Sequence, residues 1–391
     1  MSDAKFDGSL VCEIAPALRM LYMMHAKSST GIAVFCADDA VVGGAKPLSV
    51  KPCDDLAEKF AGFVKENGYA PNIAIMKGLG FFAIGKTKKE AELIKSSFLK
   101  GGAAGVPDNH GQPATVKKRL DGKIAIVTGG AQGFGKGIAD AMANEGAYIV
   151  VADLNAEGAL VCAKELCEKY GGDIAVPVAA NVADEASVQA MVEEAVLHFG
   201  GLDILVSNAG IVISGGLSEM TKEKFELVTS VNYTGYFLCA KYASVPMKIQ
   251  HEINPGYMSD IIEINSKSGL EGSNKNFAYS GSKFGGVGLT QSFALELVAF
   301  GIKVNAICPG NLLDGPLWSD PEKGLFRQYF DSGKVPGAKS IEDVRRFYES
   351  KVPMNRGCTT GDVACAILYL VEQKYETGQA LPVTGGQIML K

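Results

Sequence analysis

The 391-residue sequence lacks the features that mark several classes of protein. Its nine cysteines never occur with a CxxC spacing, which argues against structural zinc and a disulfide framework and favours reduced thiols. The histidines of the N-terminal third, His25 and His110, lie in neither an HxH nor an HExxH arrangement. A catalytic metal needs three or four such ligands, so we expect no metal site and interpret both histidines as surface or packing residues.

The sequence also lacks an excess of positive charge and a long apolar run. Lysine and arginine total 38 against 43 acidic residues, so the net charge is -5, which argues against a nucleic-acid surface. No apolar stretch reaches the roughly 20 residues that a membrane helix requires. The N-terminus shows no basic stretch followed by an apolar run, as a signal peptide would. We therefore expect a cytoplasmic protein with neither nucleic-acid nor membrane partners.

Residues 1–100 predict a small α+β domain. Apolar runs indicate strands at 31–36, 73–76 and 81–84, helical spacing indicates a helix from Leu56 to Asn67, and Thr87 with Glu90 forms a capping-box pattern that opens another helix. The segment 72–94, NIAIMKGLGFFAIGKTKKEAELI, resembles the end of a class II aldolase-like domain of the kind fused ahead of a dehydrogenase. Without metal ligands, such a remnant would serve assembly or cover another surface.

Residues 101–117, rich in Gly, Pro and polar residues, predict a linker. From 118 to 391, short Val- and Ile-rich runs alternate with helical segments, as in KIAIVTGG, YIVVADL, DIAVPVAA and DILVSNAG. This alternation predicts a Rossmann-type α/β fold, with a doubly wound parallel sheet that binds its ligand at the carboxyl ends of the strands.

The first of these strands runs directly into a glycine-rich turn. Gly129, Gly133 and Gly135 permit a tight turn and close approach of a pyrophosphate to the start of the following helix. Asp153, 18 residues after Gly135, ends the second strand, where a carboxylate can bind an adenosine ribose and repel a 2'-phosphate. No lysine or arginine lies at 131, 132, 154 or 155, so the sequence predicts NAD rather than NADP.

A second pattern suits proton transfer. Tyr279 and Lys283 are one helical turn apart, and Ser266 ends a strand 13 residues before the tyrosine. A free tyrosine has a pKa of about 10, so a nearby ammonium is needed to favour its phenolate. The YxxxK spacing alone often arises by chance, and its interpretation depends on the cofactor turn.

Together these motifs resemble the short-chain dehydrogenase/reductase family. The resemblance rests on TGxxxGxG at 128–135, Asn208-Ala209-Gly210, Asn232, Ser266, Tyr279, Lys283 and Pro309-Gly310, in family order. It implies that Ser266 orients the substrate oxygen, Tyr279 exchanges its proton, Lys283 supports the tyrosine and holds the nicotinamide ribose, and Asn232 fixes a relay water. The cofactor residues that it implies are Thr128, Gly129, Gln132, Gly133, Phe134, Gly135, Asp153, Leu154, Asn181, Val182, Asn208, Ala209, Gly210, Tyr279, Lys283, Pro309, Gly310 and Leu312.

Two positions depart from the family pattern. Asn181-Val182 stands where Asp-Val is usual at the adenine edge, although asparagine still offers hydrogen bonds. Asp314 stands where the family's PGxxxT motif has threonine, which puts the usual contact to the carboxamide in doubt.

Several further segments, including INSKSG at 264–269 and KVPMNRGC at 351–358, resemble the polyol-phosphate dehydrogenases of this family. The resemblance implies NAD-dependent oxidation of sorbitol 6-phosphate to fructose 6-phosphate. Lys267, Lys275 and Arg356 are candidates for binding the phosphate. The aromatic-rich stretch at about 312–356 interrupts the alternation, and we expect it to form a substrate lid.

Two alternatives remain open. The substrate could be an unphosphorylated polyol or a deoxy-sugar product such as lactaldehyde, as the aldolase-like leader suggests. From another class, the chain could be a non-catalytic dinucleotide-binding scaffold, against which the complete Ser266, Tyr279 and Lys283 set argues. The family resemblance also implies a homodimer or homotetramer.

Overall fold

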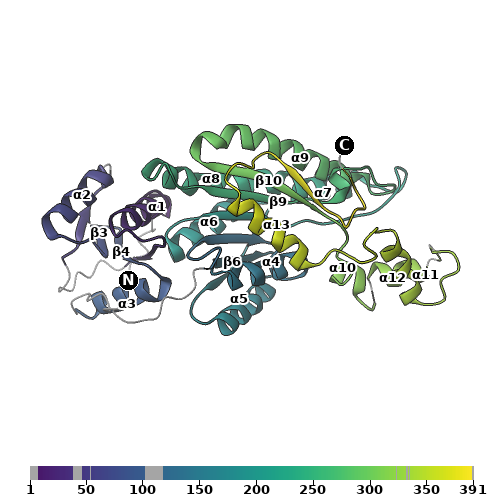
Figure 1. The fold of residues 1–391 in the computed structure, drawn as a ribbon, viewed down its shortest axis with the longest axis horizontal. Coiled ribbons are helices and arrows are strands. Elements are labelled where there is room, and N and C mark those ends of the chain that lie inside the picture. Colours follow the sequence, from purple (N-terminus) through teal and green to yellow (C-terminus); the bar gives the residue numbers. More distant parts are fainter. Residues whose placement is uncertain are drawn as a thin grey trace.

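The computed structural model describes residues 8–37, 46–52, 54–101, 118–322, 324–331, 333 and 335–389. Its strands form two separate sheets, of four and seven strands, and Figure 1 shows the N-terminal elements at one end of the long axis. The expected α/β fold with a smaller α+β unit before it is confirmed. His110 and residues 102–117 of the expected linker lie outside the described residues.

The N-terminal sheet has the strand order β1-β4-β3-β2. Alternate residues of a strand face opposite sides, so Phe82 and Ile84 pack in a cluster with α1 and α2 residues, while Phe81 and Ala83 pack with α3 residues. The elements are α1 (Gly8–His25), β1 (Ile32–Cys36), β2 (Leu48–Val50), α2 (Leu56–Asn67), β3 (Ile73–Met76), β4 (Gly80–Gly85) and α3 (Lys88–Leu99).

The structure confirms part of the local sequence patterns of the N-terminal unit. The side chain of Thr87 accepts a hydrogen bond from Glu90 N, as a helix cap should. The Glu90 carboxylate, however, accepts from Lys86 N, so only half of the expected capping box forms. His25 stacks on Phe60, as a packing residue would. The unit also contains helix α1 and strand β2, which the sequence patterns do not predict.

The second sheet has the order β11-β10-β9-β8-β5-β6-β7, and every neighbouring pair is parallel. The order reverses between β5 and β8, which is where such sheets bind ligands. Its strands are β5 (Ile124–Thr128), β6 (Tyr148–Asp153), β7 (Ala175–Ala179), β8 (Ile204–Ser207), β9 (Ser259–Ile264), β10 (Ile302–Pro309) and β11 (Ala380–Val383).

Helices cover both faces of this sheet. One core cluster joins it to α6 (Glu185–Phe199), α8 (Gly235–Ile253) and α9 (Phe277–Leu297). The other joins it to α4 (Gly133–Asn144), α5 (Ala156–Tyr170) and α13 (Thr360–Glu372). Other elements of this domain are α7 (Lys222–Thr229), the π-helix η1 (Ser230–Thr234) and the 3-10 turns η2 (Lys267–Gly269) and η3 (Val298–Phe300). No helix among the described residues is long and apolar enough to cross a membrane.

The N-terminal unit packs against the seven-stranded domain at the amino ends of its strands. Helix α1 contacts α6 and α8, and it carries the fully buried Arg19 into this joint. The guanidinium binds both carboxylate oxygens of Asp203, at 3.0 and 2.8 Å, and that residue directly precedes β8. The carboxyl ends of the strands, where a ligand is expected, therefore lie at the opposite edge.

Residues 312–356 contain three short helices, α10 (Pro316–Ser319), α11 (Leu325–Asp331) and α12 (Ile341–Ser350). They share a small apolar cluster built on Leu313, Trp318, Phe326 and Val344. Figure 1 shows these helices at the end of the molecule away from the N-terminal unit. The stretch is thus a compact helical segment far from the N-terminal unit, and its action as a lid stays a prediction.

Candidate active site

The turn between β5 and α4 has the geometry that the glycine pattern predicts. Gly129 and Gly133 have φ of 63° and 56°, in the left-handed region that favours glycine. A Cβ on Gly135 would collide with the carbonyl oxygen of Gly129, so the helix can start this close to the turn only with glycine there. Backbone N–H groups at the start of α4 are thereby left available for an anion.

The ends of β5 and β8 are held together beside this turn. The Asn208 amide donates to the carbonyl oxygens of Thr128 and Gly129, at 2.8 and 3.1 Å. In return, the Thr128 hydroxyl accepts from the backbone N–H groups of Asn208 and Ala209, both at 3.0 Å. The structure thus brings the predicted residues from Thr128 to Gly135 next to Asn208-Ala209-Gly210.

The second strand places its carboxylate against the same turn. Asp153 ends β6, and its two oxygens accept from Ala131 N at 3.0 Å and Asn155 N at 2.9 Å. Leu154 beside it is 76% exposed, so its apolar side chain is open to a ring that packs there. Both features suit the adenosine half of a dinucleotide.

The next strand ends at the residues expected to meet the adenine. Asn181 is exposed, and its side-chain oxygen accepts from Ala183 N at 3.1 Å. Val182 is buried under Gly235, the first residue of α8. Asn181 therefore shapes the loop after β7.

Strand β9 and helix α9 carry the proton-transfer residues. Ser266 follows β9, and its hydroxyl accepts from Ser268 N at 3.1 Å, which caps η2. Tyr279 is half-buried, whereas Lys283 is buried and donates from Nζ to the Ile264 carbonyl oxygen at 2.8 Å. The lysine of α9 thus reaches the end of the strand that leads to the serine.

Asn232 lies in the π-helix between α7 and α8, a type of helical irregularity that often occurs at functional sites. Its side chain is buried and fully engaged. It accepts from Ile211 N at 2.8 Å and donates to Ile211 O at 2.9 Å and to the Ser282 hydroxyl at 3.1 Å. The amide thus fixes the loop after β8 to helix α9.

Two further polar residues, Asn265 and Glu263, lie beside this set. Asn265 donates to the Lys283 carbonyl oxygen and to the Glu263 carboxylate, both at 2.8 Å. Glu263 is 1% exposed, and burial raises the pKa of its carboxyl group. The available signal was an acidic residue between two isoleucines of an otherwise apolar strand.

The three candidate phosphate residues have different surroundings. Lys267 follows Ser266 and is half-buried; burial lowers the pKa of its ammonium group, with Glu271 opposing the shift and Lys351 adding to it. Lys275 is exposed. Arg356 donates to both oxygens of Asp362, at 2.6 and 2.9 Å, so its charge is already compensated.

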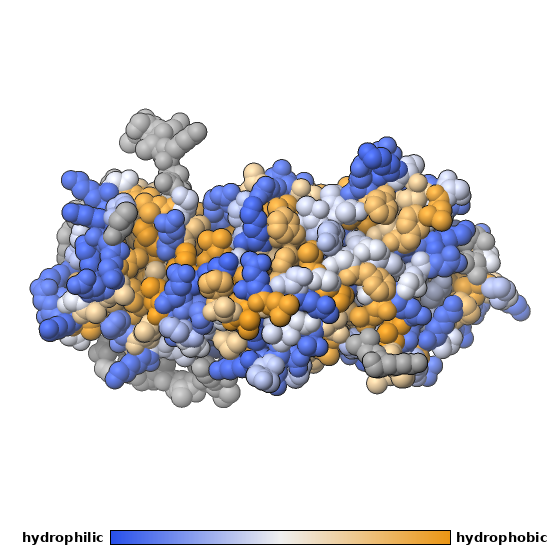
Figure 2. Space-filling view, turned by 90° about the horizontal axis from the view of Figure 1, so that it is seen from above, coloured by the Kyte–Doolittle hydropathy of each residue, from blue (hydrophilic) through white to orange (hydrophobic). Residues whose placement is uncertain are grey.

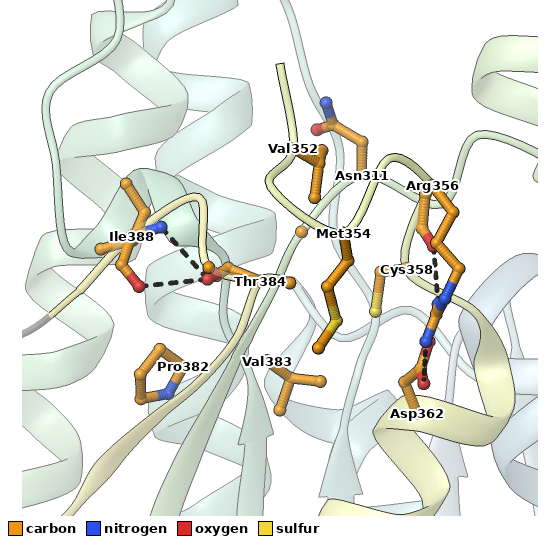
Figure 3. A pocket seen from close by; sticks show the side chains of 14 residues that line it. Asn311, Val352, Met354, Arg356, Cys358, Asp362, Pro382, Val383, Thr384 and Ile388 are labelled. Atoms are coloured by element: carbon orange, nitrogen blue, oxygen red, sulfur yellow. Dashed lines mark hydrogen bonds and ion pairs between the residues drawn. The ribbon is translucent and has the colours of Figure 1, made fainter. Parts of the chain in front are cut away.

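Arg356 also lines a pocket of about 390 Å³ at the ends of β10 and β11. Figure 3 shows its guanidinium and the Asp362 carboxylate pointing toward each other on one wall. Ser266, Tyr279 and Lys283 are not among the lining residues, which are Gly310, Asn311, Val352, Met354, Arg356, Gly357, Cys358, Asp362, Pro382, Val383, Thr384, Gly385, Gly386 and Ile388. The pocket reaches the expected cofactor contact only at Gly310, the residue after β10.

The atypical Asp314 also has a local partner. Its carboxylate binds the guanidinium of Arg345 from α12 at 2.5 Å, and Arg345 also donates to Glu349 at 2.8 Å. This pair connects the loop after Pro309, Gly310 and Leu312 to the helical segment. The aspartate that replaces the usual threonine is thus paired with Arg345, a residue of the expected lid.

The fold and these residues define a dehydrogenase of the Rossmann type, and comparison with known families agrees. The model of the short chain dehydrogenase family matches residues 123–320. The chain belongs to the short-chain dehydrogenase/reductase family, and it is an oxidoreductase of that family.

Three individual proteins show how similar this chain is to known members of the family. Sorbitol-6-phosphate 2-dehydrogenase of Escherichia coli is 39% identical over 269 residues, which are 68% of this chain and 99% of the relative. The crystal structure of sorbitol-6-phosphate 2-dehydrogenase from Erwinia amylovora superposes with a TM-score of 0.61 at 38% identity, covering 68% of this chain and all of that one. The 3-ketoacyl-(acyl-carrier-protein) reductase from Brucella melitensis, solved with NADH, has a TM-score of 0.58 at 29% identity and covers 68% and 99%.

Proposed function

We propose that this chain is an NAD-dependent dehydrogenase of a phosphorylated sugar alcohol, and that it oxidises sorbitol 6-phosphate to fructose 6-phosphate. The observation that carries the proposal is the half-buried Lys267 directly after Ser266, in a chain 39% identical to a sorbitol-6-phosphate 2-dehydrogenase. A cation held beside the substrate-orienting serine is the chemistry that a phosphorylated substrate needs.

The residues at the β5–α4 turn fit NAD. Gly133 has open space where its Cβ would lie, and Gly135 keeps the helix start close to the turn, so the N–H groups there can receive a pyrophosphate. The Asp153 carboxylate would bind the adenosine ribose, and no cation follows it to accept a 2'-phosphate. NAD, when bound, accepts the hydride from the carbinol carbon. We expect a higher kcat/KM with NAD than with NADP.

The chain's own residues move the proton. Ser266 would hold the substrate hydroxyl by a hydrogen bond, and the phenolate of Tyr279 would accept its proton as the carbonyl forms. Lys283, one turn along α9, would favour the phenolate by its charge and bind the nicotinamide ribose. Because the Asn232 amide is engaged with Ile211 and Ser282, its contribution would be to shape the site and to offer its main chain to a relay water.

Tyr279→Phe tests the chemistry. The variant should lose turnover while NADH binding, followed by fluorescence titration, stays close to that of the wild type. Tyr375→Phe, at a tyrosine that is 99% exposed, is the matched control and should keep full activity. Turnover by Tyr279→Phe would refute the assignment, and a wild-type chain that binds NADH but oxidises no polyol would favour the scaffold alternative.

Lys267→Ala tests the substrate. We expect KM for sorbitol 6-phosphate to rise by about tenfold or more, as loss of a charged hydrogen bond predicts, with little change for sorbitol. Lys275→Ala, at an exposed lysine, should have a smaller effect, and so should Arg356→Ala because Asp362 already compensates that charge. Equal turnover of sorbitol and its phosphate would instead favour an unphosphorylated polyol or a deoxy-sugar product such as lactaldehyde.

We further propose that the protein is a cytoplasmic homodimer or homotetramer. The free cysteines among the described residues suit a reducing compartment. Helices α8 and α9 expose Phe237, Val245, Phe284 and Leu295, and Figure 2 shows the molecule from the side of these helices, with orange apolar residues among the polar ones. Leu295→Lys, at a side chain 82% exposed, should reduce the mass measured by light scattering if copies associate there.

The N-terminal unit would then be an aldolase-like remnant with a structural role. No group of three or more metal-ligating side chains occurs among the described residues. Stoichiometric zinc in the purified protein would contradict this proposal.

A further inference from the structure

A buried carboxylate lies directly behind the proton-transfer residues, and the mechanism above does not use it. Glu263 lies on β9 between Ile262 and Ile264 and is 1% exposed. Its Oε2 accepts from the Asn265 amide at 2.8 Å. Its Oε1 has no hydrogen-bond partner among the described atoms, but it lies 3.7 Å from Nζ of Lys283. The carboxylate therefore faces the ammonium group of Lys283 on α9.

The helix leaves room for this carboxylate. Gly286 lies three residues after Lys283, and a Cβ there would collide with both carboxylate oxygens. Asn265 completes the arrangement, since it also donates to the Lys283 carbonyl oxygen and accepts from Ser266 N, both at 2.8 Å. One network thus connects the acid, the lysine and the residue that orients the substrate.

Few other charges act on Glu263. The cation is Lys283, from α9. Two other titratable groups face the carboxylate, Tyr236 from α8 and Cys308 from β10, and burial raises the pKa of both. Burial also raises the pKa of Glu263, while Lys283 and Asn265 favour its ionised form. A buried carboxylate without a matched cation is costly, so Lys283 is the group that makes this position acceptable for an acid.

We propose that Glu263 is a positioning residue of the dehydrogenase site, whose negative charge holds the Lys283 ammonium group and sets the pH range in which Tyr279 and Lys283 work. This inference rests on the proposed function of those two residues. Because a negative charge makes proton loss from its neighbours harder, Glu263 should oppose proton loss from both the Tyr279 phenol and the Lys283 ammonium group. The acid and alkaline limbs of the activity profile therefore both lie at higher pH than they would without it.

Glu263→Gln tests this role with little change of shape. The amide oxygen can still accept from Asn265, but the charge is gone. We expect the profile of kcat/KM against pH to move to lower pH, its alkaline limb by about one unit, which is the low end of the effect of a charge within 4–6 Å. Glu263→Asp keeps the charge but withdraws it from Lys283, so its profile should move in the same direction by less.

Asp260→Asn is the matched control. Asp260 is another buried acid of β9, but its carboxylate pairs with Lys303 at 2.9 Å rather than with Lys283. Its loss should lower the thermal midpoint without moving the pH profile. If Glu263→Gln lowers activity equally at every pH, or if the profile stays in place in each folded variant of Glu263, the inference is wrong.

The test separates the inference from the function on which it rests. Turnover by Tyr279→Phe would refute the proposed chemistry whatever Glu263→Gln shows. An inactive Tyr279→Phe together with superimposable profiles for the wild type and Glu263→Gln would refute only the role of Glu263.

Discussion

Replacing Arg19 should reveal how far the N-terminal unit stabilises the dehydrogenase sheet. Arg19 is fully buried and binds Asp203 with two hydrogen bonds, at 3.0 and 2.8 Å. It also donates to Gly31 O at 2.6 Å and to the Gln250 side chain at 3.3 Å. Arg19→Met keeps most of the apolar volume of the side chain but leaves the Asp203 carboxylate buried without its main counter-charge.

The expected loss follows from what remains around Asp203. Breaking a buried pair from one side costs about 3–5 kcal/mol. Asp203 would keep bonds from Tyr257 at 2.9 Å and Ile124 N at 2.8 Å, with the half-buried Lys123 near it. We therefore expect the low end, about 3 kcal/mol, measured as the fall in the free energy of unfolding in urea.

An exposed ion pair offers the control. Arg119 binds Glu372 at 2.6 Å, but the two side chains are 41% and 49% exposed. Water and salt screen such a pair, so Arg119→Met should cost less than about 1 kcal/mol. Equal losses in the two variants, or a loss below about 1 kcal/mol for Arg19→Met, would show that the buried network does not hold the two sheets together.

Two further predictions concern pH and the cofactor turn. The pKa of Asp203 is lowered from 3.8 to about 2, chiefly by Arg19 and Lys123 acting against burial, so the pair stabilises the fold above pH 3.8 and loses that contribution as the pH falls through about 2. Acid titration followed by circular dichroism should show a loss of about 2 kcal/mol over that range, reduced in Arg19→Met. Gly135→Ala should abolish NADH binding because its Cβ meets Gly129 O, whereas Gly62→Ala, with open space around its Cβ on α2, should be neutral or stabilising by up to about 1 kcal/mol.

The sequence was most informative where function depends on spacing along the chain. The glycines of the β5–α4 turn, Asp153 and the Tyr279–Lys283 pair are local patterns, so strand and helix periodicity sufficed to place them. The sequence could not show that Asn232 lies in a π-helix, because propensity does not distinguish that irregularity from an α-helix. The sequence pattern also does not predict helix α1, because that helix is buried on most sides and has no clear polar face.

Spacing along the sequence could not predict which charged residues pair with residues far away in the chain. Arg356 and Lys267 both looked able to bind phosphate, and only the fold shows that Arg356 is paired with Asp362 while Lys267 stays half-buried beside Ser266. Arg19 finds Asp203 across 184 positions, which no spacing rule could relate.

Arg19 and Glu263 illustrate a signal in the sequence that predicts a long-range partner. Each is a charged residue within an apolar segment, Arg19 in a helix that is buried on most sides and Glu263 between two isoleucines of β9. A lone charge in such a place is costly, so it implies an opposite charge that the rest of the chain must supply. For Arg19 that charge is a structural carboxylate at the amino edge of the sheet, whereas for Glu263 it is Lys283, a proposed catalytic lysine at the carboxyl edge. The same physical rule therefore predicts a loss of stability when Arg19 is neutralised and a displaced pH profile when Glu263 is.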